Sequence, residues 1–167
     1  QASGIVVGVM THRFPGHEGP TRRVWLAGDP ARMMGAVAED ECRRIIAAFD
    51  LAEHEGIPVE WVALSAGAQI SMDRGTENMD WCAAVVRRIL EFTQHGGEVV
   101  VVVAGINVGA QGYWNSTAAM LGHCAGMLVM VDGAAMVLTG RRALAMSGGV
   151  ASDTDVELGG YPEVMGP

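Results

Sequence analysis

Two short turns that contain glycine, each after a predicted strand, offer backbone N–H groups that could bind a ligand. The first is Ser65-Ala66-Gly67-Ala68-Gln69, which follows the apolar residues 59–64. Because glycine has no Cβ, it lets the backbone approach a ligand closely and present its N–H groups. A tight turn that merely precedes a helix would have the same composition. This turn alone therefore leaves both interpretations open.

The second turn spans residues 105–112, between the five valines 99–103 and a predicted helix. N–H groups at a helix N-terminus favour negative charge, either a phosphate or an oxyanion that develops during a reaction. The glycine spacing, with Asp132 about 20 residues later, also matches a nicotinamide-dinucleotide fingerprint. Against that alternative, the turn comes late, a similar turn precedes it, and the chain has no lysine for a Tyr–Lys pair.

Other reactive side chains give weaker signals. His12, His17 and Glu18 could bind a metal ion, but they lie in a glycine- and proline-rich stretch without a third ligand, so a solvated loop and no metal are expected. Asp73 and Glu77 suit acid–base chemistry, and they equally suit a helix N-terminus. No G-x-S-x-G motif is present. Four arginine pairs are predicted on solvated faces: Arg22-Arg23, Arg43-Arg44, Arg87-Arg88 and Arg141-Arg142.

Alternating strands and helices must position the two turns. Strand-like runs cover residues 4–10, 24–27, 59–64, 99–103, 127–131 and 136–138, and helical patterns cover about 32–55, 79–95, 115–123 and a segment that opens near 139–142. This alternation favours parallel pairing in one α/β layer. In such sheets ligands bind beyond the carboxyl ends of the strands, where both turns fall. The valine run predicts a strand buried on both faces.

Composition narrows the class of protein. The chain has 167 residues, 50% hydrophobic and 18% charged, which suits one domain with a sizeable core. Its net charge is −8 and its 11 basic residues are all arginine, so we expect neither nucleic-acid binding nor Schiff-base chemistry. No apolar run is long enough to span a membrane. Cys42, Cys82 and Cys124 form no C-x-x-C pair, which favours free buried thiols in a reducing, cytoplasmic compartment.

Four motifs, in order and with matching spacing, resemble the carboxyltransferase domain of biotin-dependent acyl-CoA carboxylases. Residues 38–59 lead into Ser65-Ala66-Gly67-Ala68-Gln69, as a similar helix in that family enters a strand that ends in Ser-Gly-Gly-Ala-Arg or Ser-Gly-Ala-Arg. Val108-Gly109-Ala110 matches the family's second glycine pair. Leu138-Thr139-Gly140 and Glu157-Leu158-Gly159-Gly160 match its later Thr-Gly and Leu-Gly-Gly. The resemblance covers residues 4–165.

The resemblance implies a crotonase-like fold (ClpP/crotonase), a layered β-β-α superhelix with a mostly parallel sheet. Residues 1–167 would form one such domain, the N-terminal half of a carboxyltransferase and part of a longer chain. The implied activity moves a carboxyl group from carboxybiotin to the α-carbon of an acetyl- or propionyl-CoA type of substrate. The implied partners are acyl-CoA, biotin on a separate carrier domain, the biotin carboxyl carrier and biotin carboxylase domains, a C-terminal carboxyltransferase half, and further copies in a homo-oligomer.

The resemblance also assigns the site. Gly109 and Ala110 would be the catalytic N–H donors that stabilise an enolate. The substrate cleft would be shaped by Ser65, Ala66, Gly67, Ala68, Gln69 and Val108. Three residues depart from the family pattern, because Gln69 stands where arginine is common and Ala66 and Ala110 replace glycines. Alanine still presents its N–H, provided that its φ is one that alanine adopts.

Three alternatives remain open from the sequence. An enoyl-CoA hydratase or isomerase would need a glutamate beside the cleft, here Glu77 or Glu98. A nicotinamide-binding oxidoreductase would use the late glycine turn and Asp132. A non-catalytic assembly module would keep the fold and lack the second half of the active site. Binding of CoA, and activity after the missing half is supplied, would distinguish these classes.

Overall fold

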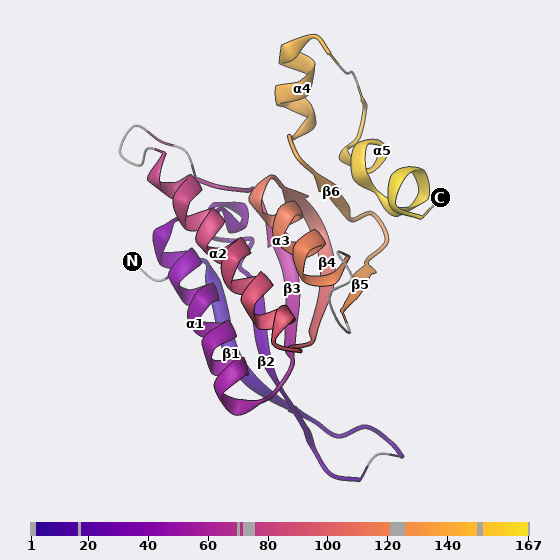
Figure 1. Cartoon of the computed structure of the whole chain (residues 1–167). Helices are drawn as coiled ribbons and strands as arrows, with labels where there is room; N and C mark the ends of the chain where they lie inside the picture. Colours follow the sequence, from indigo (N-terminus) through magenta and orange to yellow (C-terminus); the bar gives the residue numbers. More distant parts are fainter. Residues whose placement is uncertain are drawn as a thin grey trace.

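A six-stranded sheet forms the centre of the molecule (Figure 1), with strands in the order β1-β2-β3-β4-β5 and β6 paired to the far end of β4. The computed structural model describes residues 3–16, 18–69, 71, 76–120, 126–149 and 152–166. The strands are β1 (Ile5–His12), β2 (Thr21–Gly28), β3 (Val59–Ser65), β4 (Val99–Val108), β5 (Met127–Met130) and β6 (Ala135–Val137). The helices are η1 (Met33–Gly35), α1 (Glu39–Glu55), α2 (Glu77–Gln94), α3 (Ala110–Ala119), α4 (Arg141–Ser147), α5 (Asp155–Gly159) and η2 (Tyr161–Met165).

The sheet is mostly parallel, as predicted. β2, β3, β4, β5 and β6 pair in parallel, whereas β1 and β2 form an antiparallel hairpin. The hairpin arms are longer than the predicted strands, because β1 reaches His12 and β2 begins at Thr21. Backbone pairing from His12↔Thr21 to Ile5↔Gly28 carries both strands through polar residues that have no strand-like pattern of their own.

One face of the sheet is covered by α1, α2 and α3, which lie side by side in Figure 1. Val99, Val101 and Val103 of β4 point into this layer and are fully buried, while Val100 and Val102 on the other face are half-buried. The prediction of burial on both faces was therefore wrong within the described residues. The alternating pattern arises because the helices cover one side of the pleated strand only.

Aromatic side chains fill the space between the sheet and the helices. Trp61 of β3 stacks on Trp114 of α3 with ring centroids 5.8 Å apart, and Phe49 of α1 meets Trp61 edge-on at 6.0 Å. Phe92 of α2 packs edge-to-face on Phe49 at 5.3 Å. Trp61 and Trp114 are fully buried, and their stack forms the centre of the core.

Helix boundaries differ from the prediction where tertiary pairing intervenes. α1 begins at Glu39, not near residue 32, because Met33 and Met34 have positive φ and form a separate short helix. Its predicted end is confirmed, since Gly56 adopts φ +61° and closes the helix. α3 begins at Ala110, not near Asn115, because β4 continues to Val108.

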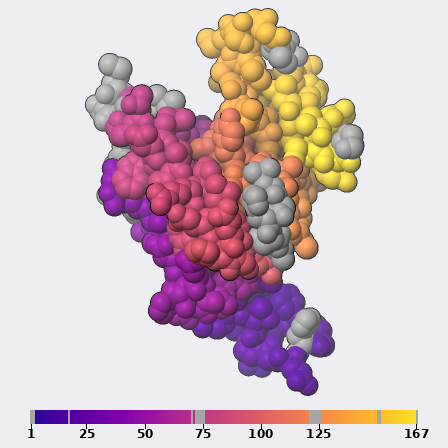
Figure 2. Space-filling view, in the orientation of Figure 1, coloured from indigo at the N-terminus to yellow at the C-terminus, as the bar shows by residue number. Residues whose placement is uncertain are grey.

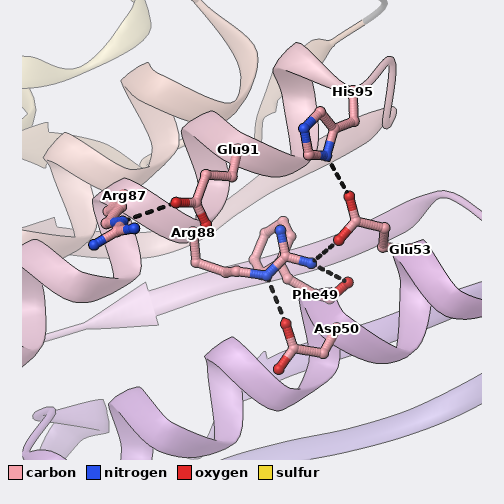
Figure 3. A network of polar contacts seen from close by, with 7 residues as sticks. All are labelled: Phe49, Asp50, Glu53, Arg87, Arg88, Glu91 and His95. Carbon is pink, nitrogen blue, oxygen red and sulfur yellow. Dashed lines mark hydrogen bonds and ion pairs between the residues drawn. The ribbon is translucent and has the colours of Figure 1, made fainter.

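A buried arginine joins α1 to α2 (Figure 3). The Arg88 side chain is only 10% exposed and donates to Asp50 Oδ1 at 2.6 Å and to Glu53 Oε2 at 2.5 Å. Glu53 also contacts His95 Nδ1 at 2.7 Å, so this carboxylate bridges Arg88 of α2 and the residue that follows that helix. The prediction that Arg88 lies on a solvated face was wrong, because two carboxylates from α1 neutralise its charge at the helix interface.

Glu53 is expected to make the stability of the protein depend on acid pH. The hydrogen bond from His95, with those from Arg88, holds the pKa of the Glu53 carboxyl below its ordinary value. A folded-state pKa below the unfolded value stabilises the fold above the unfolded pKa, and that stabilisation disappears as the pH falls through the folded pKa. Urea unfolding of wild type and Glu53→Gln should therefore differ at neutral pH and converge below about pH 4. A difference that stays constant would contradict this, and Glu91→Gln, in an exposed pair with Arg87, is the control.

The C-terminal segments form a lobe that stands apart from the three-helix layer (Figures 1 and 2). α4 buries none of its residues, whereas α5 packs on β6, where a Cβ at Gly159 would overlap the backbone of Met136. No helix among the described residues is long and apolar enough to cross a membrane. Cys42 and Cys82 are free and buried, as predicted, and Cys124 lies outside the described residues.

Candidate functional site

The two glycine turns lie next to each other at the carboxyl ends of β3 and β4. Ser65, the last residue of β3, pairs with Asn107 of β4. Gly67 has φ +94°, and a Cβ added there would lie 3.0 Å from the carbonyl oxygen of Val108. Glycine is required at residue 67 for both reasons, its backbone conformation and the close approach of the second turn.

The first turn is held by hydrogen bonds to residues far away in the sequence. Ser65 Oγ donates to Gly35 O at 2.6 Å and accepts from Gly67 N at 3.0 Å. The N–H of Ala66 donates to Met34 O at 2.9 Å, and that of Gln69 donates to Val37 O at 2.7 Å. The turn is therefore fixed by the segment that precedes α1.

The second turn joins β4 to α3 in a single residue. Gly109 adopts φ +56°, a conformation that favours glycine, and its N–H donates to Val137 O of β6 at 2.9 Å. α3 follows at once, so Ala110 is its first residue. The N–H of a first helical residue has no acceptor within its own helix.

The N–H groups of Ala68 and Ala110 have no acceptor among the described residues. Both residues line the same cavity. The N–H groups of Gly67 and Gly109, by contrast, are already used by Ser65 Oγ and Val137 O. The sequence assigned Gly109 and Ala110 as donors, but the N–H of Gly109 already donates to Val137 O of β6, whereas the N–H of Ala68 in the neighbouring turn is free. The catalytic role of Ala110 stays a prediction.

A buried chain of side-chain amides supports the second turn from below. Asn107 Nδ2 donates to Ala63 O at 3.0 Å, Asn115 Nδ2 donates to Asn107 Oδ1 at 2.9 Å, and Gln111 Nε2 donates to Asn115 Oδ1 at 2.8 Å. All three side chains are almost fully buried. Asn115 lies in the middle of α3 and links this helix to β4 through Asn107. The i,i+4 spacing of Gln111 and Asn115 was the available signal.

An apolar cavity of about 570 Å³ opens beside the two free N–H groups. Its floor is formed by the two turns and by Trp114, one wall by α2, and the rim by residues 138–140 and 143. It is lined by Ala66, Gly67, Ala68, Met79, Cys82, Ala83, Val86, Val108, Gly109, Ala110, Tyr113, Trp114, Leu138, Thr139, Gly140 and Ala143. Of the predicted cleft residues, Ala66, Gly67, Ala68 and Val108 line it, whereas Ser65 and Gln69 do not.

A second cavity of about 410 Å³ adjoins the first and shares Ala66, Val108, Gly140 and Ala143 with it. Arg141 and Arg142 line this cavity. Arg141 is paired with Asp155, with Nε 3.9 Å from Oδ2. Arg142 is exposed and has no carboxylate partner among the described residues. The second cavity therefore carries a net positive charge beside the apolar one.

The other candidate side chains lie elsewhere. Glu98 precedes β4, so it lies at the end of that strand opposite to the turns, and it pairs with Arg23 at 3.6 Å. Asp132 is exposed after β5. None of Glu77, Glu98 and Asp132 lines the apolar cavity. The described part of the chain contains no cluster of His, Cys, Asp or Glu that could hold a metal ion, and Asp73 and His17 lie outside it.

Cys42 and Cys82 meet where α1 faces α2, and only Cys82 lines the cavity. The hydrogen bond with Cys82, together with burial, raises the pKa of the Cys42 thiol. Cys42 therefore stays protonated at neutral pH. The same hydrogen bond lowers the pKa of the Cys82 thiol, so the described lining of the cavity offers backbone N–H groups and one thiol.

The fold and the sequence of the chain both resemble those of known proteins. Its fold is that of the crotonase-like carboxyltransferases. It overlays on the transcarboxylase 12S hexamer, crystallised with hydrolysed methylmalonyl-coenzyme A, with a TM-score of 0.75 and 19% identity over 95% of this chain and 27% of that one. It overlays on the geranyl-CoA carboxylase beta subunit of P. aeruginosa with a TM-score of 0.73 and 21% identity over 98% and 28%. No curated protein matches the sequence.

The model of the carboxyl transferase domain family matches residues 19–167, and the chain belongs to that family. The family resemblance read from the four motifs is thereby confirmed, and the nicotinamide alternative is set aside. The chain spans little more than a quarter of the length of the two carboxyltransferase structures it overlays on.

Proposed function

We propose that this chain supplies the acyl-CoA side of a carboxyltransferase site, in which the N–H groups of Ala68 and Ala110 bind the thioester oxygen. The observation that supports the proposal is that these two groups, from two different turns, lack an acceptor and line one cavity. The transcarboxylase 12S structure, which shares the fold, holds a coenzyme A ester of methylmalonate. A CoA thioester is therefore the class of substrate that we assign to this cavity.

The two N–H groups would act on the charge that develops during the reaction. When the C–H bond at the α-carbon breaks, its electron pair passes into an enolate, and the negative charge gathers on the thioester oxygen. Two fixed donors stabilise that charge more than they stabilise the neutral thioester, and so lower the barrier. The buried amides of Asn107, Asn115 and Gln111 hold the second donor in place, so little reorganisation is needed during the reaction.

Biotin would reach this site from outside the chain. Apart from the hydroxyl groups of Tyr113 and Thr139, the side chains that line the apolar cavity offer no polar partner for a ureido ring. We therefore assign the biotin-binding residues to a C-terminal carboxyltransferase half, and a separate carrier domain would bring the group. Carboxybiotin would supply CO2 to the enolate, and the biotin nitrogen freed by that release would accept the α-proton, so the described lining of the cavity needs no carboxylate or imidazole base.

Calorimetric titration of the full-length protein with acetyl-CoA, and with NADH and NADPH as matched controls, tests the proposal. Saturable binding of the CoA ester alone is expected. NADH or NADPH binding without CoA binding would overturn the proposal. If carboxyl transfer occurs only when the C-terminal half is present, the protein is an enzyme. If CoA binds but no transfer occurs even with the C-terminal half present, the protein is a non-catalytic assembly module.

Arg142 is expected to strengthen binding of CoA through its phosphate groups. Its guanidinium lies at the cavity that adjoins the apolar one and has no carboxylate to neutralise it. Arg142→Ala should weaken CoA binding by roughly three- to tenfold, because an exposed charge pair contributes about 1 kcal/mol, and the loss should shrink in high salt. Binding of acyl-pantetheine, which lacks the nucleotide phosphates, should not change. Equal losses for both ligands would show that Arg142 does not contact phosphate.

A further inference from the structure

The apolar cavity is larger than a short acyl group requires. Its volume is about 570 Å³, whereas an acetyl group adds only two carbon atoms to the thiol. The space exists because small residues line it, among them Ala83 on α2 and Ala143 at the rim. The two free N–H groups fix the thioester at one end of this space, so the remainder is available to whatever extends from the acyl carbon.

The wall provided by α2 is an apolar stripe. Met79, Cys82, Ala83 and Val86 recur at intervals of three and four residues, which places them on one face of the helix. The adjoining face of α2 packs Val85, Ile89 and Phe92 into the core. At the mouth, Met79, Tyr113 and Leu138 are each more than half exposed, an apolar rim of the kind that marks a binding surface.

The chemistry of the lining selects among the parts of an acyl-CoA. The pantetheine arm carries two amides, and burying an amide without hydrogen-bond partners costs several kcal/mol. Hydrocarbon needs no partner, and its transfer from water into such a lining is favourable. The positively charged second cavity lies beside this one and suits the phosphate end of the molecule. The apolar cavity therefore suits the hydrocarbon tail.

We propose that this cavity binds the hydrocarbon tail of the acyl group, so that the substrate is a medium-chain acyl-CoA, and that Ala83 and Val86 set the chain length. The inference rests on the proposed function. It differs from the acetyl- or propionyl-CoA type of substrate that the family resemblance implies, because either short chain would leave most of the apolar wall in contact with water.

Binding of a series of CoA thioesters to the full-length protein tests the inference. Affinity should rise roughly fourfold for each added methylene from acetyl-CoA to decanoyl-CoA, until the cavity is full. Affinity that is the same for all chain lengths would overturn the inference and leave the proposed function standing. Failure of every CoA thioester to bind would overturn the proposed function, and the inference with it.

Variants of α2 locate the tail. Ala83→Phe should lower the ratio of decanoyl-CoA to acetyl-CoA affinity by about tenfold or more, because the added ring fills part of the cavity. The smaller side chain of Ala83→Leu should lower the same ratio by about threefold. Arg87→Phe is the matched control, since it adds an aromatic ring to the same helix at a side chain that is 81% exposed and does not line the cavity. Thermal unfolding shows whether each variant is folded. A ratio that stays at the wild-type value in both Ala83 variants, as in Arg87→Phe, would show that the tail lies elsewhere and overturn the inference.

Discussion

Replacing Ala110 by proline is expected to lower kcat for carboxyl transfer by about 100- to 1000-fold, with the fold intact. Proline removes the N–H of residue 110, for which the described part of the chain offers no acceptor, and proline is well tolerated at the first position of a helix. The preceding residue, Gly109, has ψ −115°, outside the α region that a following proline disfavours. The variant therefore deletes one donor and little else.

Steady-state kinetics of the full-length protein with an acyl-CoA would measure this effect. We expect kcat to fall far more than KM rises, since an oxyanion donor acts mainly on the transition state. Ala110→Ser is the matched control, because serine keeps the N–H and is close to alanine in size. An Ala110→Pro protein that is folded and retains wild-type kcat would show that the charge develops elsewhere.

The positions of both turns could be predicted from local sequence. Gly67 and Gly109 each follow an apolar run, and glycine at such a point indicates a backbone that side chains would obstruct. Both do have positive φ. The parallel sheet and the end of α1 at Gly56 were predictable for the same reason, since each depends on residues within a few positions of one another.

Which N–H groups remain free could not be predicted, because that depends on contacts between distant segments. Gly109 loses its N–H to Val137 O, 28 positions further along the chain, because β6 pairs with the end of β4 from Ile106 to Val108. The same pairing lengthens β4 beyond the valine run and moves the start of α3 to Ala110. A three-residue strand such as β6 has too few residues for its partner to be deduced from a pattern.

The amide chain beneath the second turn was missed for a related reason. Asn107 lies in a segment of strand that sequence alone assigns to a loop, and its partner Asn115 is eight residues further on, within α3. Each asparagine by itself suggests a turn or a cap. Only their burial and mutual hydrogen bond show that they hold the strand and helix together.

Replacing Trp114 by alanine is expected to lower the free energy of unfolding by about 3–5 kcal/mol, among the largest effects of any single truncation here. Trp114 is fully buried, stacks on Trp61, and donates from Nε1 to Cys82 O at 3.1 Å. The hydrogen bond joins α3 to α2 directly beneath the apolar cavity. The change should therefore affect stability and ligand binding together.

A graded series separates packing from hydrogen bonding at Trp114. Trp114→Phe keeps an aromatic ring but loses the donor to Cys82 O, so urea unfolding should show a loss of about 1–2 kcal/mol, well below that of the alanine variant. Trp81→Ala is the control, because Trp81 is only partly buried and packs under Arg43, whose guanidinium lies 4.3 Å from its ring; about 1 kcal/mol is expected there. Equal losses for Trp81→Ala and Trp114→Ala would contradict a core centred on the Trp61–Trp114 stack. If the losses follow this order, Trp114 both lines the bottom of the cavity and holds α2 and α3 on the sheet. The site is then as rigid as the core on which it lies.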